Sequence, residues 1–267
     1  MIARDNAQGD GDDFRHCEES GTCGTLPIAA EPPGTYHLWP LVTPLQPSMT
    51  SDLARARENM IEQQIRPWEV LDPRVLAVFR QVERDRFVPD AYRNVAYSDV
   101  EIPIGHSERM MKPVVEARLL QALELTGSER VLEIGTGSGF LAACLARLSA
   151  GVTSIERHRD LAEAARLRLA GAGIAGVRIE CADALAGWRP EGRFDAIAVT
   201  GAVDAIPALL LDCLAEGGRM FVVHGHAPAM QAALVTRIDA GHVRTDSLFE
   251  TELDYLFGAA PKPRFVL

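Results

Sequence analysis

The sequence has few of the features that mark an extracellular, membrane-spanning or nucleic-acid-binding protein. Five cysteines in 267 residues are too sparse to suggest a disulfide scaffold. No run approaches the ~20 apolar residues that a membrane-spanning helix needs, and no basic region followed by an apolar run marks a secretory signal. Basic residues are in deficit, with 27 Lys and Arg against 37 Asp and Glu, which argues against a phosphate backbone as the main partner. We therefore expect a cytoplasmic protein that binds neither membranes nor nucleic acids.

The first 48 residues differ from the rest of the chain. They carry acidic residues from Asp10 to Glu19 and prolines from Pro27 to Pro47, without a helical or alternating period. A segment of this kind buries too little apolar area to offset its chain entropy. We expect residues 1–48 to be a disordered tail. Alternatively Met49 is the true start, because a regular pattern begins directly after it.

Residues 49–125 predict a helical cap that includes a long loop. Helical periodicity indicates three helices, at 50–65 with its end at Pro67, from Asp72-Pro73 onward, and at 114–125. Asp72 is suited to cap the second helix, and a proline fits its first turn. Residues 87–113 show no clear period and are expected to be mostly loop.

Residues 126–267 alternate between strand and helix patterns. Strands are expected at 130–134, 152–156, 177–180, 195–199, 219–224, 233–238 and 247–253, and helices at 141–148, 161–169 and 208–214. Gly217-Gly218 is expected to end the last of these helices. Such alternation predicts a parallel, doubly wound sheet. The expected fold class is therefore α/β: one catalytic domain, 49–267, with a Rossmann-like, mostly parallel seven-stranded sheet and an N-terminal helical cap.

The sharpest local signal is VLEIGTGSGF at 131–140, where an apolar strand runs into a glycine-rich turn and then a helix. Glycines let the backbone approach a ligand closely, and a helix N-terminus presents N–H groups. The spacing is not the G-x-G-x-x-G of dinucleotide-binding folds, and a Gly-Lys-Ser/Thr phosphate loop is absent. A tight turn without a ligand is one remaining explanation. The E-x-G-x-G-x-G form, however, resembles motif I of class I S-adenosylmethionine (SAM)-dependent methyltransferases, which implies SAM contacts at Glu133, Gly135, Thr136, Gly137 and Gly139.

Two acidic residues follow the next two predicted strands. Glu156 lies about 20 residues after the first glycine, a position that faces the ribose hydroxyls in a doubly wound fold. Asp183 follows the third strand, and the methyltransferase resemblance implies that Asp183 and Ala184 lie against the adenine. Either carboxylate alone could be a solvated loop residue. Together they fit one crevice at the carboxyl ends of the strands.

From about Ala54 onward the chain resembles the protein-L-isoaspartate O-methyltransferases. The matching stretches are ENMIEQQI (58–65), the block at 72–89, AYSDVEIPIGH (96–106), VLEIGTGSGF (131–140), FDAIAVTGAVDAIP (194–207) and LAEGGRMFVV (214–223). The blocks before the glycine loop and the T-G-A-x-x-x-I-P segment are more specific than the loop itself, because most methyltransferases share the loop and lack these flanks.

The resemblance implies a protein-repair activity. Members of the family transfer the SAM methyl to the α-carboxyl of an isoaspartyl residue, and the ester then collapses to a succinimide that can reopen as normal aspartate. A carboxylate with a pKa of about 4 is already ionised at about pH 7, so catalysis reduces to holding it in line with an activated methyl. The implied partners are isoaspartyl-containing proteins or peptides, and we expect the enzyme to be a monomer.

The acceptor loop departs from the family pattern. The family loop usually reads G-Q-T-I-S-x-P after I-G-H, and its serine contacts the acceptor carboxylate. Here the aligned stretch, 107–113, has Met111 at the serine position and Glu108 at the glutamine position. A thioether donates no hydrogen bond, and an ionised Glu108 nearby would repel an anionic acceptor. The candidate catalytic residues are therefore Met111 by alignment, Arg109 (or Lys112) as a cation for the carboxylate, and Thr200.

This departure leaves other functions open. A small-molecule methyltransferase that kept the scaffold and changed its acceptor loop would also fit, and a SAM-binding protein without catalysis is a third hypothesis. Nucleic-acid methylation fits less well, because residues 200–203 read TGAV where adenine and cytosine N-methylases typically carry Asn/Asp-Pro-Pro-Tyr/Phe. His224 and His226 have no third ligand at a matching position in the sequence, so no metal site is expected.

Overall fold

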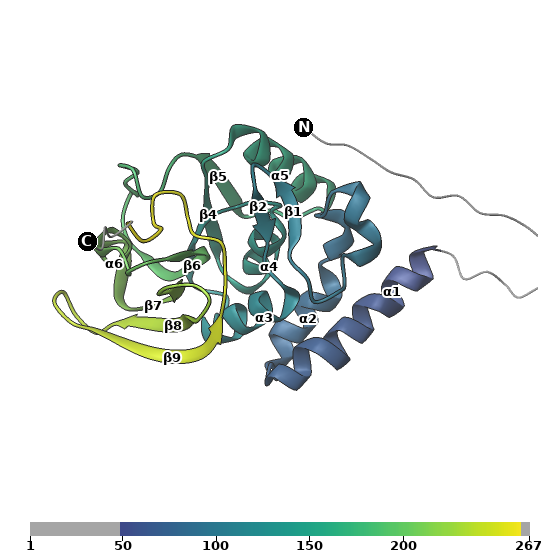
Figure 1. The fold of residues 1–267 in the computed structure, drawn as a ribbon, viewed down its shortest axis with the longest axis horizontal. Helices are drawn as coiled ribbons and strands as arrows, with labels where there is room; N and C mark the ends of the chain where they lie inside the picture. Colours follow the sequence, from purple (N-terminus) through teal and green to yellow (C-terminus); the bar gives the residue numbers. More distant parts are fainter. Residues whose placement is uncertain (1–48, 263–267) are drawn as a thin grey trace, which may run out of the picture. The chain divides into compact units, whose positions relative to one another are not determined.

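The computed structural model describes residues 49–262, so the expectations for residues 1–48 lie outside the described range. Seven strands form one sheet in the order β5-β4-β3-β6-β7-β8-β9 (Figure 1). They are β3 (Arg130–Ile134), β4 (Gly151–Glu156), β5 (Val177–Cys181), β6 (Phe194–Val203), β7 (Leu214–His224), β8 (Met230–Arg237) and β9 (Val243–Thr251). The strands from β5 to β7 pair in parallel, and β8 and β9 are antiparallel. This confirms the predicted mostly parallel seven-stranded sheet.

The central strands are buried on both faces, as a parallel sheet with helices on either side requires. Successive residues of β3 enter different apolar clusters: Val131 packs in one and Leu132 in the other, and both are 0% exposed. The first cluster includes residues of α2 (Pro73–Gln81), α3 (Pro113–Ala122), α4 (Phe140–Leu148) and α5 (Arg159–Gly171). The second includes Leu210 of α6 (Ala208–Asp212).

The strand order reverses beside β3. From β3 the chain steps outward through β4 and β5, and it then returns to place β6 on the other side of β3. In open α/β sheets such a switch point leaves a crevice beyond the carboxyl ends of the two strands. The glycine-rich turn at 135–139 follows β3 directly, so the topology puts it in this crevice.

The N-terminal helices extend slightly further than predicted. Helix α1 (Met49–Met60) continues as a π-helical turn (Ile61–Ile65) and a 3-10 turn (Arg66–Trp68). Pro67 therefore sits inside the last turn rather than ending the run, since proline is tolerated in the first turn of a new helical segment. Helix α2 begins as expected, with the Asp72 side chain accepting a 2.8 Å hydrogen bond from the Arg74 N–H.

The predicted loop at 87–113 contains a β-hairpin that sequence analysis missed. Strands β1 (Ile102–Gly105) and β2 (Glu108–Met110) pair antiparallel and lie beside α5 (Figure 1). Their two-residue turn has positive φ at His106 (53°) and Ser107 (64°). Such turns favour glycine or asparagine, so the sequence carries no turn signal here. The segment before the hairpin forms two 3-10 turns, Arg84–Arg86 and Asp90–Val95.

Two predicted boundaries in the C-terminal half were wrong. Strand β6 continues past its predicted end at residue 199 and includes Thr200 and Gly201, which lie in an irregular stretch between the pairs Ala198–Phe221 and Ala202–Val223. Helix α6 ends at Asp212, and Gly217-Gly218 lies inside β7. The register between β6 and β7 shifts at this point, from Phe194 opposite Leu214 to Ala196 opposite Arg219. Gly217-Gly218 lies between these two pairs, in the irregular stretch of β7.

Candidate active site

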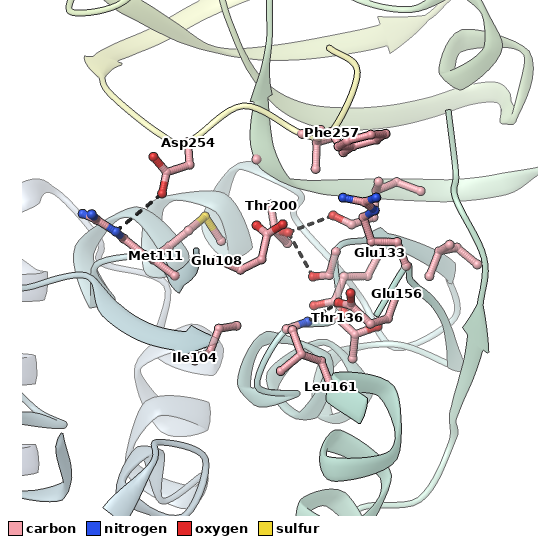
Figure 2. A pocket seen from close by; sticks show the side chains of 18 of the residues that line it. Ile104, Glu108, Met111, Glu133, Thr136, Glu156, Leu161, Thr200, Asp254 and Phe257 are labelled. Carbon is pink, nitrogen blue, oxygen red and sulfur yellow. Dashed lines mark hydrogen bonds and ion pairs between the residues drawn. The ribbon is translucent and has the colours of Figure 1, made fainter. Parts of the chain in front are cut away.

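One pocket lies at the carboxyl ends of the central strands. In Figure 2, Ile104, Glu108 and Met111 line one side, and Glu133, Thr136 and Glu156 line the other. The segment 253–257, which follows β9, contributes Asp254 and Phe257 above the opening. Ten of the eleven predicted site residues line this one pocket, namely Arg109, Met111, Glu133, Gly135, Thr136, Gly137, Glu156, Asp183, Ala184 and Thr200.

The eleventh, Gly139, lies behind the pocket wall. It has a φ of +87° and is the N-cap of α4. A Cβ built on it would come 3.2 Å from the Cβ of Ala165 in α5. Gly139 therefore allows close packing of the turn on α5, and its contact with SAM stays a prediction.

Gly135 brings the turn close to β6. Its φ is +95°, and its N–H donates to the Ile155 carbonyl at 2.9 Å. Thr200 Oγ1 lies 2.8 Å from the Ile134 carbonyl and 2.9 Å from that of Gly135. A Cβ on Gly135 would collide with this hydroxyl. The threonine and the glycine thus fix the start of the turn together, and only glycine fits at the first position.

Glu133 is a buried carboxyl at the base of the pocket. Its side chain accepts a short hydrogen bond from Ser154 Oγ, which also lies 2.5 Å from Thr136 Oγ1. Its other oxygen, Oε1, has no hydrogen-bond partner among residues 49–262. The pKa of Glu133 is raised to about 8, chiefly by burial and to a smaller extent by the nearby carboxylates of Glu156 and Glu116, against the lowering effect of the hydrogen bond from Ser154. A cationic ligand group would satisfy the unpaired oxygen and favour its charged form.

Glu156 holds the glycine turn from the neighbouring strand. One of its oxygens accepts from the Gly137 N–H and the other from the His158 N–H, each at 2.9 Å. The side chain is only 5% exposed, although it lines the pocket. A carboxylate has about four lone-pair sites, so two acceptor positions remain available for ribose hydroxyls. The position fits the predicted role, which stays a prediction.

Asp183 shapes the turn after β5. Its Oδ1 accepts from the N–H groups of Leu185 and Ala186, at 2.9 and 3.1 Å. Ala184, the residue after Asp183, is buried in the second apolar cluster. These contacts form the pocket wall next to Glu156 and are compatible with the predicted adenine site.

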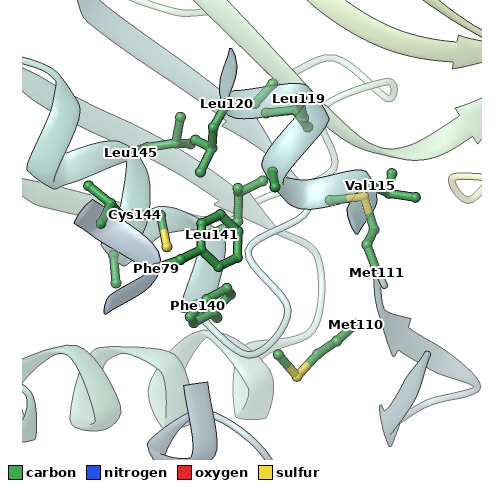
Figure 3. Packing of buried hydrophobic residues seen from close by; sticks show 14 of the residues in the cluster. Phe79, Met110, Met111, Val115, Leu119, Leu120, Phe140, Leu141, Cys144 and Leu145 are labelled. Atoms are coloured by element: carbon green, nitrogen blue, oxygen red, sulfur yellow. The ribbon is translucent and has the colours of Figure 1, made fainter. Parts of the chain in front are cut away.

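On the acceptor side, the hairpin presents one apolar and two charged groups to the pocket. Met111 is 5% exposed and packs on Val115 and its apolar neighbours (Figure 3). Arg109 lies at the mouth, where its Nη1 is 3.4 Å from Glu101 Oε2 and its Nε is 3.6 Å from Asp254 Oδ2. Glu108 turns toward His158, with 3.6 Å between Oε1 and Nε2. The charge that we expected to repel an acceptor is therefore directed at an imidazole.

Two parts of the pocket were missed by sequence analysis. The segment 253–257 is held to β6 by hydrogen bonds between Ala202 and both Asp254 and Leu256, and Phe257 then stacks on the Arg157 guanidinium at 3.6 Å. Local sequence gives no sign of this crossing. Glu116 of α3 also lines the pocket and was missed, although a single acidic residue within the apolar sequence of α3 could have indicated it.

The described residues fit SAM as a ligand. The unpaired Glu133 oxygen suits the ammonium of its methionine part, and Gly135 and Gly137 line the same pocket without side chains that would obstruct a ligand. Within residues 49–262 no group of three or more His, Cys, Asp and Glu side chains could hold a metal ion. In the same range, no helix is both long and apolar enough to cross a membrane.

Comparisons with known proteins agree with the family that the sequence resembles. Residues 55–253 match the family described as protein-L-isoaspartate(D-aspartate) O-methyltransferase (PCMT). The protein-L-isoaspartate O-methyltransferase 1 of Rhodopseudomonas palustris is 40% identical over 228 residues, which cover 83% of this chain and 93% of the relative. That of Methanoculleus marisnigri is 46% identical over 166 residues, 62% of this chain and 76% of the relative.

A solved structure agrees at the level of the fold. It is a crystal structure of a Plasmodium falciparum protein assigned as a protein-L-isoaspartate O-methyltransferase, in complex with S-adenosyl-L-homocysteine (SAH). It superposes with a TM-score of 0.65 at 22% identity, over 76% of this chain and 97% of that chain. With the sequence match over most of its length, this chain belongs to the protein-L-isoaspartate(D-aspartate) O-methyltransferase family.

Proposed function

We propose that the protein is a SAM-dependent O-methyltransferase that methylates the α-carboxyl of isoaspartyl residues in damaged proteins and peptides. The observation that carries this proposal is the single pocket shared by the glycine turn and the acceptor hairpin, with Glu133 and Met111 both on its wall. Family membership and relatives of the same name favour this acceptor over a small molecule.

The proposed cofactor contacts follow the three parallel strands. Glu133 and the turn from Gly135 to Gly137 hold the methionine part, Glu156 binds the ribose, and Asp183 with Ala184 faces the adenine. Support comes from the order of these residues along the pocket wall and from the unpaired oxygen of Glu133.

The chemistry asks the protein mainly for position. Bound SAM supplies a methyl group activated by the sulfonium. The acceptor carboxylate is ionised at neutral pH, so a general base is not required, and the residues only hold its oxygen in line with the methyl. Thr200, where β6 passes the end of β3, is proposed to line the space between the acceptor oxygen and the methyl group.

Arg109 is proposed to bind the acceptor carboxylate in place of the family's serine. Met111 cannot donate a hydrogen bond, and its buried side chain supplies apolar wall instead. Arg109 carries donors in a fork that matches a carboxylate. It lies two residues before Met111, and both line the pocket. A monomeric state and a cytoplasmic location remain predictions from the sequence.

The test is transfer of labelled methyl from SAM to a peptide that carries one isoaspartate. The matched control is the same peptide with normal aspartate, and SAH binding is confirmed by calorimetry in the same preparation. We expect methylation of the isoaspartyl peptide alone. No transfer by a preparation that binds SAH would overturn the acceptor assignment, and methylation of both peptides would overturn its selectivity.

A further inference from the structure

Arg84 is a fully buried arginine that the proposed chemistry does not use. It lies in the 3-10 turn at Arg84–Arg86, and its side chain is 0% exposed. One end of the guanidinium, Nη1, forms an ion pair with the carboxylate of Glu116, whose side chain is 4% exposed. The other end, Nη2, donates to the main-chain carbonyl of Met111 at 2.8 Å. The guanidinium carbon also lies 4.7 Å from the centre of the Phe140 ring.

These three contacts reach both halves of the site. Met111 directly follows strand β2 of the acceptor hairpin, at the position of the family's serine. Glu116 is in α3 and lines the pocket. Phe140 is the first residue of α4, directly after the glycine turn. A single planar side chain therefore fixes the acceptor loop relative to the helix that begins at the cofactor turn.

Stability alone is a weak explanation for such a pair. Removing two charges from water is costly, and well-packed apolar residues in place of a buried ion pair are often neutral or stabilising. The arginine fork, however, constrains two partners at once, which a lysine or an apolar side chain cannot do. The Met111 carbonyl is one of these two partners, so the geometry determines where the following residues point.

We propose that Arg84 and Glu116 are positioning residues for the acceptor loop: the pair holds the Met111 main chain, and thereby Arg109, at the distance that the acceptor carboxylate requires. The kinetic test of this inference rests on the proposed function, whereas a second test, hydrogen exchange of the loop amides, does not.

The main variant is R84M/E116M, which removes both charges and keeps the pair's net charge at zero. We expect its SAH affinity to stay within about two-fold of wild type, and its kcat/KM for the isoaspartyl peptide to fall by about 10- to 100-fold, as for a small misplacement of reacting groups. The matched control is R219M, which removes a guanidinium that contacts the Leu123 and Glu124 carbonyls at the far end of α3. R219M is expected to lower thermal stability without changing the peptide KM.

The conservative variant R84K covers the case in which the double variant does not fold. Lysine keeps the charge opposite Glu116 but cannot also span to the Met111 carbonyl, so we expect a folded protein with a raised peptide KM and an unchanged SAM KM. An unchanged peptide KM in R84K, or equal losses of peptide and SAH affinity in either variant, would overturn the proposal.

Hydrogen exchange separates this proposal from the acceptor assignment. In R84M/E116M and R84K, the amides of residues 108–112 should exchange faster than in wild type, while those of α4 remain protected. This readout needs no acceptor. A wild-type protein that ignores isoaspartyl peptides would refute the acceptor assignment only, whereas unchanged loop exchange in both variants would refute the positioning role.

Discussion

Asp254 Oδ2 lies 3.6 Å from Arg109 Nε, so the residue proposed to bind the acceptor carboxylate already faces a carboxylate of the same chain. Glu101 lies on its other side, 3.4 Å from Nη1. Arg109 and Asp254 are 53% and 59% exposed, and both line the mouth of the pocket. An incoming acceptor carboxylate must therefore compete with Asp254 for the guanidinium.

Removing this competitor should improve acceptor binding. Exposed ion pairs contribute about 0.2–1 kcal/mol, so we expect D254N to lower the peptide KM by up to about five-fold, with kcat little changed. Steady-state kinetics with the isoaspartyl peptide measures this. D246N is the matched control, because Asp246 forms a similar exposed pair with Arg244 on β9. A peptide KM that rises in D254N would mean that Asp254 contacts the acceptor instead of competing with it.

Loss of the guanidinium itself should have the opposite effect. Hydrogen bonds to charged groups contribute about 1.5–3 kcal/mol, so R109M should raise the peptide KM by about ten-fold or more and leave the SAM KM unchanged. R244M removes a similarly exposed arginine of β9 that does not line the pocket, and it should change neither constant. If R109M behaves as wild type and K112M raises the peptide KM, the carboxylate contact belongs to Lys112.

The stability of the SAM-free protein should depend on pH through its buried carboxyls. Burial raises the pKa of Glu133 from 4.5 to about 8, and that of Glu116 from 4.5 to about 7. An acid with a raised pKa binds more protons in the folded state than in the unfolded state, so its contribution is fully present below pH 4.5 and is lost as pH rises through the folded value. Thermal unfolding midpoints should therefore fall as pH rises from about 4.5 to about 8.

The variant E133Q isolates the upper part of this range. Glutamine does not titrate, so the fall in the unfolding midpoint above about pH 7 should flatten in this variant. The fall at lower pH that is due to Glu116 should remain. Glu129 is an internal contrast, because hydrogen bonds from Thr126 and its neighbours lower its pKa to about 2 against the effect of burial, which confines its effect to acid pH. An undiminished slope in E133Q would show that Glu133 is not the titrating group.

The turn at Gly135 should tolerate no side chain. In G135A the added Cβ would meet the hydroxyl of Thr200, and the alanine would have to adopt a φ of +95°. We therefore expect the SAH affinity measured by calorimetry to fall by at least about ten-fold. G127A is the control, because Gly127 has a φ of +105° and no atom of the described chain within 4 Å of the added Cβ. It should show only backbone strain, about 1–3 kcal/mol of stability, with normal SAH binding.

The parts of the fold that could be predicted from sequence have local causes. The Asp72 cap, the apolar strands from Arg130 to Glu156 and the glycine-rich turn each follow from residues that are neighbours in the chain, where capping, alternation and backbone freedom act. The acidic residues after successive strands were also readable, because parallel strands end at one edge of the sheet.

Elements that depend on distant partners could not be read in this way. The hairpin turn at His106-Ser107 has no glycine, and its conformation goes with contacts such as the 2.8 Å interaction of His106 with Asp160 in α5. Gly201 resembles a turn residue, yet it lies within β6, in the irregular stretch between the pairs Ala198–Phe221 and Ala202–Val223, with Leu256 packed closely against it.

The sequence by itself determined the doubly wound sheet, the glycine turn and the acidic residues at the strand ends, because each depends on short-range periodicity or on chain geometry. Only the tertiary structure decided what surrounds Met111 and Arg109. The Arg84–Glu116 pair joins residues 32 positions apart, and Phe257 reaches Arg157 from the other end of the catalytic core. Such contacts are selected by packing and by the need to pair buried charges, and neither leaves a periodic trace in the chain.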